Sequence, residues 1–241
     1  MNDGFPSVAA MTGAGVSAES GIATFRGMGG MWENVPIEEV ATPQGFSRDP
    51  LKVWEFYQAR REQCASCSPN PCHHALARLE DSLEGRFTLI TQNVDGLHAL
   101  AGSRRILELH GSLWRVRCSQ CGTEIEDRTV PYPELPPRCS CGGMLRPGVV
   151  WFGEALPAEI FEDAYQSASE CSLFIVAGTS GVVEPAASLA RVAAAAGARV
   201  WEVNPEETPL TPYCQRSWRA PGGEVMDEVA DAALESLDED R

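Results

Sequence analysis

The chain has 241 residues, which is enough to bury one sizeable core with a small appended module. Its 34 acidic and 19 basic side chains give a net charge of −15, which repels nucleic acid and anionic lipid. The longest basic runs, Arg60-Arg61 and Arg104-Arg105, are too short to follow a phosphate backbone. No apolar stretch approaches the roughly 20 residues that a membrane span requires. We therefore expect one large domain with an insertion. We also expect that the protein binds neither nucleic acid nor a membrane.

Strands and helices are predicted to alternate along the chain. Runs of apolar and β-branched residues predict buried parallel strands over residues 7–11, 87–91, 172–177 and 199–203. Helices are expected over residues 51–64, 185–196 and 225–237. Ser47 or Asp49 would start the first of these helices, and Gly197 would close the second. The pattern is typical of an α/β fold with a Rossmann-like, doubly wound parallel sheet.

The composition shifts twice, which indicates two excursions from this sheet. Residues 27–50 are rich in Gly, Pro and Glu, and residues 117–147 are rich in Cys and Pro. We expect a Rossmann-like domain, a helical and loop insertion and a small cysteine-rich module. The expected boundaries are residues 1–27, 82–115 and 148–241 for the first, 28–81 for the second and 116–147 for the third.

Two cysteine pairs, Cys118-x-x-Cys121 and Cys139-x-Cys141, supply the four thiolates that tetrahedral zinc prefers. The proline-rich stretch 123–138 between them has few large apolar groups, so it needs a staple in order to fold. Two disulfides are the alternative, disfavoured because the chain shows no signal peptide and carries further scattered cysteines. Four thiolates leave no open coordination position, so we expect one structural zinc ion. We also expect the protein to be a cytoplasmic monomer.

A glycine-rich turn follows the first predicted strand. Gly13-x-Gly15-x-x-Ala18 opens a helix, so its backbone amides could hold a pyrophosphate; the alternative is a turn that only packs strand against helix. A dehydrogenase would carry an acidic residue after a second strand about 20 residues on, and no strand is predicted there. Hydride transfer is therefore disfavoured.

Polar residues follow the other strands, and the carboxyl ends of parallel strands meet at one crevice. These residues are Gln92, Asn93, Asp95, Gly178, Thr179, Ser180 and Asn204, each of which alone could be a turn or cap residue. His110 ends a short apolar run and is the best general base available, although a structural histidine is the alternative. We take His73, His74 and His98 as structural. Cys64, Cys67, Cys72 and His73 could instead form a second metal or redox cluster.

Together these residues resemble the sirtuin family of NAD-dependent protein-lysine deacylases. Residues 13–26 resemble its first cofactor motif and residues 91–98, Thr-Gln-Asn-Val-Asp-Gly-Leu-His, its second. The remaining motifs follow in the family's order at residues 109–112, 150–154 and 178–180. The resemblance extends from Thr12 to about Val225. Ala23 stands where a proline is common, and Cys139-x-Cys141 is one residue tighter than the usual second pair.

The resemblance implies that NAD is consumed as a co-substrate and that acyl-lysine proteins are the partners. The acyl oxygen would attack the nicotinamide ribose and expel nicotinamide, His110 would take a ribose proton, and O-acyl-ADP-ribose would leave. Phe25 would shield the reactive face from water. The implied cofactor-binding residues are Gly13, Ala14, Gly15, Glu19, Phe25, Arg26, Trp32, Gln92, Asn93, Asp95, Gly178, Thr179, Ser180, Asn204, Pro205, Glu206 and Gly222. The implied substrate-binding residues are Tyr57, Arg60, Val150, Phe152, Gly153 and Glu154, with Gly181-Val182 as a second clamp strand.

Tyr57 and Arg60 lie three residues apart on the predicted helix, so they share a face. They resemble the class III branch that removes succinyl, malonyl or glutaryl groups, in which the tyrosine hydroxyl and the guanidinium bind the acyl carboxylate. We expect desuccinylation with some deacetylation. The alternatives are a packed tyrosine beside a surface arginine paired with Glu62, a mainly deacetylating enzyme, a non-catalytic NAD or ADP-ribose sensor, an ADP-ribosyl transferase and a zinc-ribbon scaffold.

Overall fold

The computed structural model describes residues 6–24, 31–32 and 35–238. Phe25 and Arg26, two of the expected cofactor-binding residues, lie outside these ranges. The backbone of Trp32 belongs to a short strand, but its side chain is outside the description. No helix within the described ranges is long and apolar enough to cross a membrane.

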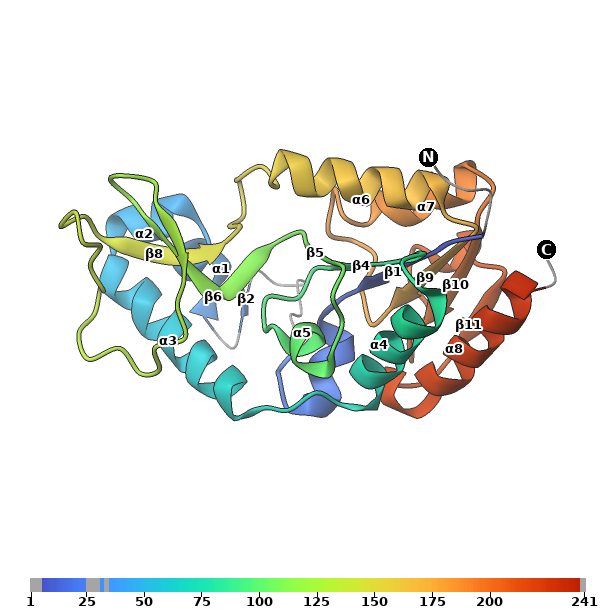
Figure 1. Ribbon diagram of the computed structural model, residues 1–241. Helices are drawn as coiled ribbons and strands as arrows, with labels where there is room; N and C mark the ends of the chain where they lie inside the picture. Colours follow the sequence, from blue (N-terminus) through green and yellow to red (C-terminus); the bar gives the residue numbers. More distant parts are fainter. Residues whose placement is uncertain (1–5, 25–30, 33–34, 239–241) are drawn as a thin grey trace.

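A six-stranded parallel sheet in the order β11-β10-β9-β1-β4-β5 forms the centre of the larger lobe (Figure 1). Its strands are β1 (Val8–Thr12), β4 (Phe87–Thr91), β5 (Ile106–Glu108), β9 (Leu173–Ala177), β10 (Arg199–Val203) and β11 (Arg216–Trp218). In β1, Val8 and Ala10 enter one core cluster, whereas Ala9 and Met11 enter another on the opposite face. Both faces are thus buried, which confirms the predicted doubly wound parallel sheet.

Two pairs of helices cover the faces of the sheet (Figure 1). Helices α4 (Pro71–Leu83) and α8 (Gly222–Asp238) pack against each other and share a core with Phe87 and Leu89 of β4. Helices α6 (Ala158–Glu170) and α7 (Ser188–Ala195) cover the other face with Phe174 of β9. Short elements complete this lobe: η1 (Ala14–Ser20), α5 (Leu97–Ala101) and η2 (Thr211–Tyr213).

The domain boundaries stay a prediction, although the packing of α4 bears on them. Leu76, Leu79 and Leu83 of α4 lie in the core beneath the large sheet. Asn70 caps this helix by accepting from the backbone amides of Cys72 and His73. The end of the segment 28–81 therefore packs with the large sheet rather than with the insertion.

The smaller lobe combines helices with a three-stranded antiparallel sheet in the order β7-β6-β8. Asp49 caps its long helix by accepting from Lys52 N, so Asp49, not Ser47, provides the cap. Two core clusters hold this lobe together around Tyr57, Trp151 and Trp54. Its elements are β2 (Met31–Trp32), β3 (Val35–Pro36), α1 (Ile37–Val40), α2 (Pro43–Arg48), α3 (Pro50–Ser66), β6 (Gly111–Cys118), β7 (Glu124–Glu126) and β8 (Leu145–Val149).

Candidate active site and metal centre

The four cysteines converge at one end of the small sheet. Their sulfur atoms all lie within 4.8 Å of one another, with Sγ–Sγ distances of 3.5 Å for Cys118–Cys141 and 3.8 Å for Cys121–Cys139. A tetrahedral zinc ion with Zn–S bonds of about 2.3 Å places its sulfurs about 3.8 Å apart, whereas a disulfide bond measures about 2.05 Å. All four cysteines are free. The cluster therefore fits a structural zinc ion, in spite of the tight second pair.

Backbone amides surround this cysteine cluster. Gln120 N and Cys121 N donate to Cys118 Sγ at 3.4 Å, and Gly143 N donates to Cys141 Sγ at the same distance. Such donors stabilise thiolates in the form that binds metal. In the part of the chain that the structure describes, no other group of three or more ligands comes together. The alternative of a second metal cluster at Cys64, Cys67, Cys72 and His73 is therefore wrong, and a redox role of these cysteines stays a prediction.

The glycine-rich turn after β1 packs tightly against the loop after β9. Gly13 N donates to Ala177 O at 3.0 Å, and Gly15 N donates to Gly178 O at 2.8 Å. A Cβ added at Gly15 would lie only 2.7 Å from Gly178 O, so glycine is required for this approach. The Gly15 amide is used within the protein, and the two loops form one edge of the crevice.

Glu19, which was expected near the cofactor, joins η1 to the start of α8. Its carboxylate accepts from Gly223 N at 2.7 Å. A Cβ on the neighbouring Gly222 would lie 2.8 Å from Cys72 Sγ, so the start of α8 also packs closely on α4. These contacts hold the helix that lies beside the crevice.

Asn93 and Asp95 follow β4 and are joined by Ser17, a residue to which the sequence analysis gave no role. Asn93 Nδ2 donates to Gly13 O at 3.1 Å and to Ser17 Oγ at 3.2 Å, and Ser17 Oγ donates to Asp95 Oδ2 at 2.8 Å. All three side chains are buried. Burial raises the pKa of Asp95, and hydrogen bonds from Leu97 N and Ser17 oppose this shift. The only sequence signal for Ser17 was its place within the first glycine-rich motif.

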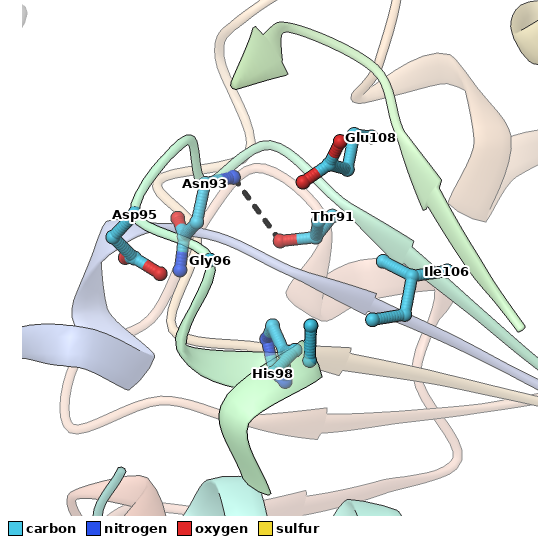
Figure 2. Close-up of a pocket in the computed structure, with 8 residues that line it drawn as sticks. Thr91, Asn93, Asp95, Gly96, His98, Ile106 and Glu108 are labelled. Atoms are coloured by element: carbon cyan, nitrogen blue, oxygen red, sulfur yellow. Dashed lines mark hydrogen bonds between the residues drawn. The ribbon is translucent and has the colours of Figure 1, made fainter. Parts of the chain in front are cut away.

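Figure 2 shows Asn93 and Asp95 of this polar cluster, together with other residues that line a small cavity. Asn93 N donates to Thr91 Oγ1 at 3.1 Å, and Glu108 at the end of β5 lies on the other side of the cavity. His98 of α5 lies below them, with Nε2 2.9 Å from Thr12 Oγ1. Burial lowers the pKa of His98 to about 3, so its ring is neutral at pH 7. His98 is therefore a structural histidine, as expected.

His110 lies between β5 and β6, and a hydrogen bond to a main-chain carbonyl determines which of its ring nitrogens carries the proton. Its Nδ1 is 3.1 Å from Gln92 O. A carbonyl oxygen only accepts, so Nδ1 carries the proton and Nε2 keeps its lone pair. Burial lowers the pKa of His110 below its ordinary value, against the opposing effect of the Gln92 hydrogen bond. A neutral imidazole with an available Nε2 lone pair is suited to act as a general base at pH 7.

The carboxyl ends of β9 and β10 bring the remaining polar residues together. Asn204 Nδ2 donates to Thr179 O at 2.7 Å, and Gln92 Nε2 donates to Thr179 Oγ1 at 3.1 Å. Thr179 is buried, whereas Ser180, Pro205 and Glu206 are exposed. The residues expected at the strand ends therefore do lie along one edge of the large sheet.

Tyr57 and Arg60 are both buried on α3, with 1% and 4% of their surfaces exposed. Arg60 is therefore not the surface arginine of the alternative, whereas Tyr57 is packed in a core cluster, as that alternative expected. Trp151 Nε1 donates to Tyr57 Oη at 3.0 Å, and the Arg146 guanidinium stacks 3.5 Å from the centre of the Trp151 ring. The charge of Arg60 also lowers the pKa of Asp95, so this pair lies within electrostatic reach of the polar cluster.

The segment after β8 presents Phe152 and Gly153 at the surface, with Phe152 47% exposed and Gly153 in the left-handed region at φ +88°. Val150 N donates to His110 O at 2.8 Å, which ties this segment to the candidate base. Glu154 accepts from Arg146 Nη1 at 2.6 Å and from Trp151 N at 2.9 Å. Although burial opposes its ionisation, the Arg146 contact lowers the pKa of Glu154. Its carboxylate therefore holds the segment in place.

Comparison with known proteins shows which family this chain is similar to. Residues 13–185 match the model of the Sir2 family. The chain is 51% identical over 225 residues to an NAD-dependent protein deacylase of Aquifex aeolicus, covering 93% of this chain and 94% of that protein. It is 51% identical over 221 residues to NAD-dependent protein deacylase 1 of Archaeoglobus fulgidus, covering 91% and 90%.

Solved structures of Sir2 proteins are also similar to this chain. A Sir2 homologue in complex with NAD superimposes with a TM-score of 0.88 at 48% identity, covering 95% of this chain and 90% of that one. A Sir2 structure with an inhibitor, 2'-O-acetyl-ADP-ribose and a deacetylated p53 peptide gives 0.82 at 31% identity, covering 95% and 94%. The likeness thus spans both lobes.

Proposed function

The chain belongs to the Sir2 family and is an NAD-dependent protein deacylase, and from this premise we propose that it removes succinyl and malonyl groups from protein lysines in preference to acetyl groups. NAD is the co-substrate, and acyl-lysine proteins are the substrates. Deacetylation is a second, slower activity. That the enzyme acts as a monomer in the cytoplasm stays a prediction.

The observation that carries the acyl preference is the buried Arg60 beside Tyr57. A guanidinium can donate two parallel hydrogen bonds to one carboxylate, and such a contact is stronger at a buried site than at the surface. Trp151 Nε1 donates to Tyr57 Oη at 3.0 Å, which orients the phenol, and a tyrosine hydroxyl is a suitable donor to an acyl carboxylate. An acetyl group offers no such carboxylate and should be discriminated against.

His110 is the proposed catalytic base. NAD supplies the ribose that receives the acyl group and the nicotinamide that leaves. His110 Nε2 accepts a proton from a ribose hydroxyl, while Nδ1–H remains bonded to Gln92 O and keeps the ring oriented. Asn93 and Asp95, held by Ser17, orient the nicotinamide ribose. Phe25 excludes water, and Asn204 with Glu206 holds the adenosine half.

The four clustered cysteines fit a zinc ion, and the polar residues at the strand ends fit NAD. Four thiolate sulfurs saturate a tetrahedral ion, so zinc stabilises the small lobe and takes no part in the chemistry. The buried amide, carboxyl and imidazole groups at the strand ends supply the polar contacts that a dinucleotide needs. The exposed Phe152-Gly153 segment and Val182 are the proposed clamp for the substrate backbone.

The test is mass spectrometry of one peptide that carries either acetyl-lysine or succinyl-lysine, incubated with and without NAD. We expect faster, NAD-dependent unmasking of the succinyl peptide with release of nicotinamide. Arg60→Met should reduce kcat/KM for succinyl-lysine about 100-fold, which corresponds to a lost charged hydrogen-bonded contact. Acetyl-lysine should lose far less.

Lys52→Met is the matched control, because Lys52 is an exposed cation of the same helix. It should leave both activities unchanged. Equal losses for the two peptides in Arg60→Met, or an acetyl preference in the unaltered enzyme, would contradict the proposed acyl preference without affecting the family assignment.

A further inference from the structure

Glu202 is a fully buried carboxylate near the carboxyl end of β10, with 0% of its surface exposed. Its Oε1 accepts from Thr208 Oγ1 at 2.5 Å, and its Oε2 accepts from Thr211 Oγ1 at 2.7 Å. Arg219 Nη1 also donates to Oε2 at 2.7 Å. A buried charge destabilises a fold unless it is paired and hydrogen-bonded, and these three donors meet that requirement.

The donors come from separate connections at this edge of the sheet. Thr208 and Thr211 belong to the turn that leads into η2, where Thr208 N donates to Thr211 Oγ1 at 2.9 Å. Arg219 follows β11, and its Nη1 also lies 3.4 Å from Asn204 O and from Glu206 O. One carboxylate therefore fixes the turn, the β11–α8 connection and, through Arg219, the backbone of residues 204–206.

We infer that Glu202 is a positioning residue for NAD, which sets the 204–206 loop in the conformation that receives the adenosine half. This inference rests on the proposed role of Asn204 and Glu206 in binding that half. The loop side chains lie at the surface, where a ligand can reach them, while Glu202 lies beneath them. Arg219 balances the charge of Glu202, so this buried carboxylate is paired within the protein.

A purely structural role would resemble that of Glu80, which offers a matched control. Glu80 is 5% exposed and accepts from the backbone amides of Arg104 and Arg105, both at 2.9 Å, at the start of β5. This is the opposite end of the strand from the crevice. Glu80→Gln should lower thermal stability and leave the KM for NAD unchanged.

The experiment compares steady-state kinetics of the zinc-loaded enzyme and its Glu202→Gln variant, with NAD and acyl peptide varied in turn. We expect the KM for NAD to rise about tenfold, from weakened hydrogen bonds to a charged group, with kcat changed less than twofold. The KM for the peptide should not change. Thr211→Val, which removes a single donor to Glu202, should raise the KM for NAD in the same direction, so the test holds even if Glu202→Gln folds poorly.

Asn204→Ala separates failure of this inference from failure of the proposed site. If Asn204→Ala leaves the KM for NAD unchanged, the adenosine half does not bind at this loop. If Asn204→Ala raises that KM while Glu202→Gln and Thr211→Val behave like Glu80→Gln, the loop binds NAD but Glu202 does not position it. Equal increases in the KM for NAD and for peptide would also overturn the inference.

Discussion

Acid should destabilise this enzyme through two buried histidines, His73 and His98. Their rings lie 4.7 Å apart, and 0% and 3% of their surfaces are exposed. Burial is the main cause that lowers the pKa of His73 to about 4 and of His98 to about 3, from an ordinary value of 6.5. A neighbouring histidine adds to each shift: His74 acts on His73, and His73 acts on His98.

The direction in which stability changes with pH follows from whether the folded or the unfolded chain binds the protons. Below pH 6.5 the unfolded chain takes up a proton at each imidazole, while the folded chain takes up none until the pH nears 4 or 3. The stability that these groups contribute is therefore fully present above pH 6.5 and is lost as the pH falls towards the folded pKa values. At pH 5 the loss is about 2 kcal/mol for each histidine, or about 4 kcal/mol together. That is a large fraction of the 5–15 kcal/mol typical of a folded domain.

Other groups titrate in the same range, so the assay must measure a difference. Burial raises the pKa values of Asp95 and Glu108, and acid therefore stabilises the fold through these carboxyl groups. Urea unfolding followed by circular dichroism at pH 7.5 and pH 5 should be compared for the unaltered enzyme and His98→Gln. The stability advantage of the unaltered enzyme should shrink by about 2 kcal/mol at pH 5.

His74→Gln is the control, because His74 is exposed on the same helix as His73. Because the effect of His74 on the pKa of His73 is smaller than that of burial, this variant should change the pH dependence of stability far less than His98→Gln does. An advantage over His98→Gln that stays constant between pH 7.5 and pH 5 would refute the reasoning. So would an NMR titration in which the His98 ring of the folded enzyme takes up its proton near pH 6.5.

Three further predictions concern the site. His110→Ala should lower the rate of peptide deacylation by at least about 100-fold with no change in melting temperature, and a variant that keeps its activity would exclude His110 as the base. Cys139→Ser should reduce bound zinc, measured by atomic absorption, and lower the melting temperature; unchanged metal content would place zinc elsewhere. Trp151→Phe keeps the ring but removes the donor to Tyr57, so the ratio of succinyl to acetyl activity should fall severalfold. In a Tyr57→Phe background the same change should have no further effect, and an equal fall there would contradict the argument.

The four central strands of the large sheet could be predicted from the sequence because they are buried on both faces, whereas the more exposed edge strands β5 and β11 were not predicted. Residues 87–91 and 173–177 are uninterrupted runs of apolar and β-branched side chains, a pattern that depends on local sequence alone. Helix α6 was missed because its buried positions are alanines, Ala164 and Ala168, among charged residues. Strand β8 was missed because it contains Pro147 and Gly148, which are typical of a turn.

In the candidate site, too, some features could be predicted from the sequence and others could not. The cysteine spacing and the polar residues after the strands are local signals, and the fold brings each set together. Contacts between residues far apart in the chain could not be predicted. The Ser17–Asp95 hydrogen bond, the Trp151–Tyr57 hydrogen bond and the ion pair between the buried Glu202 and Arg219 depend on packing that a single sequence does not reveal.

Arg60 connects the two halves of the proposed chemistry, and this affects how its variants must be assayed. Its charge opposes the effect of burial on Asp95, so Arg60→Met should raise the pKa of Asp95 further. A protonated Asp95 would weaken use of NAD for every acyl peptide, which would resemble a loss of catalysis. Well above the raised pKa, Asp95 is ionised in both proteins, and only the contact with the acyl group differs between them. The succinyl and acetyl rates of Arg60→Met should therefore be compared over a pH series, on the plateau where the rates no longer rise with pH, because a difference between the two peptides there reports on recognition of the carboxylate.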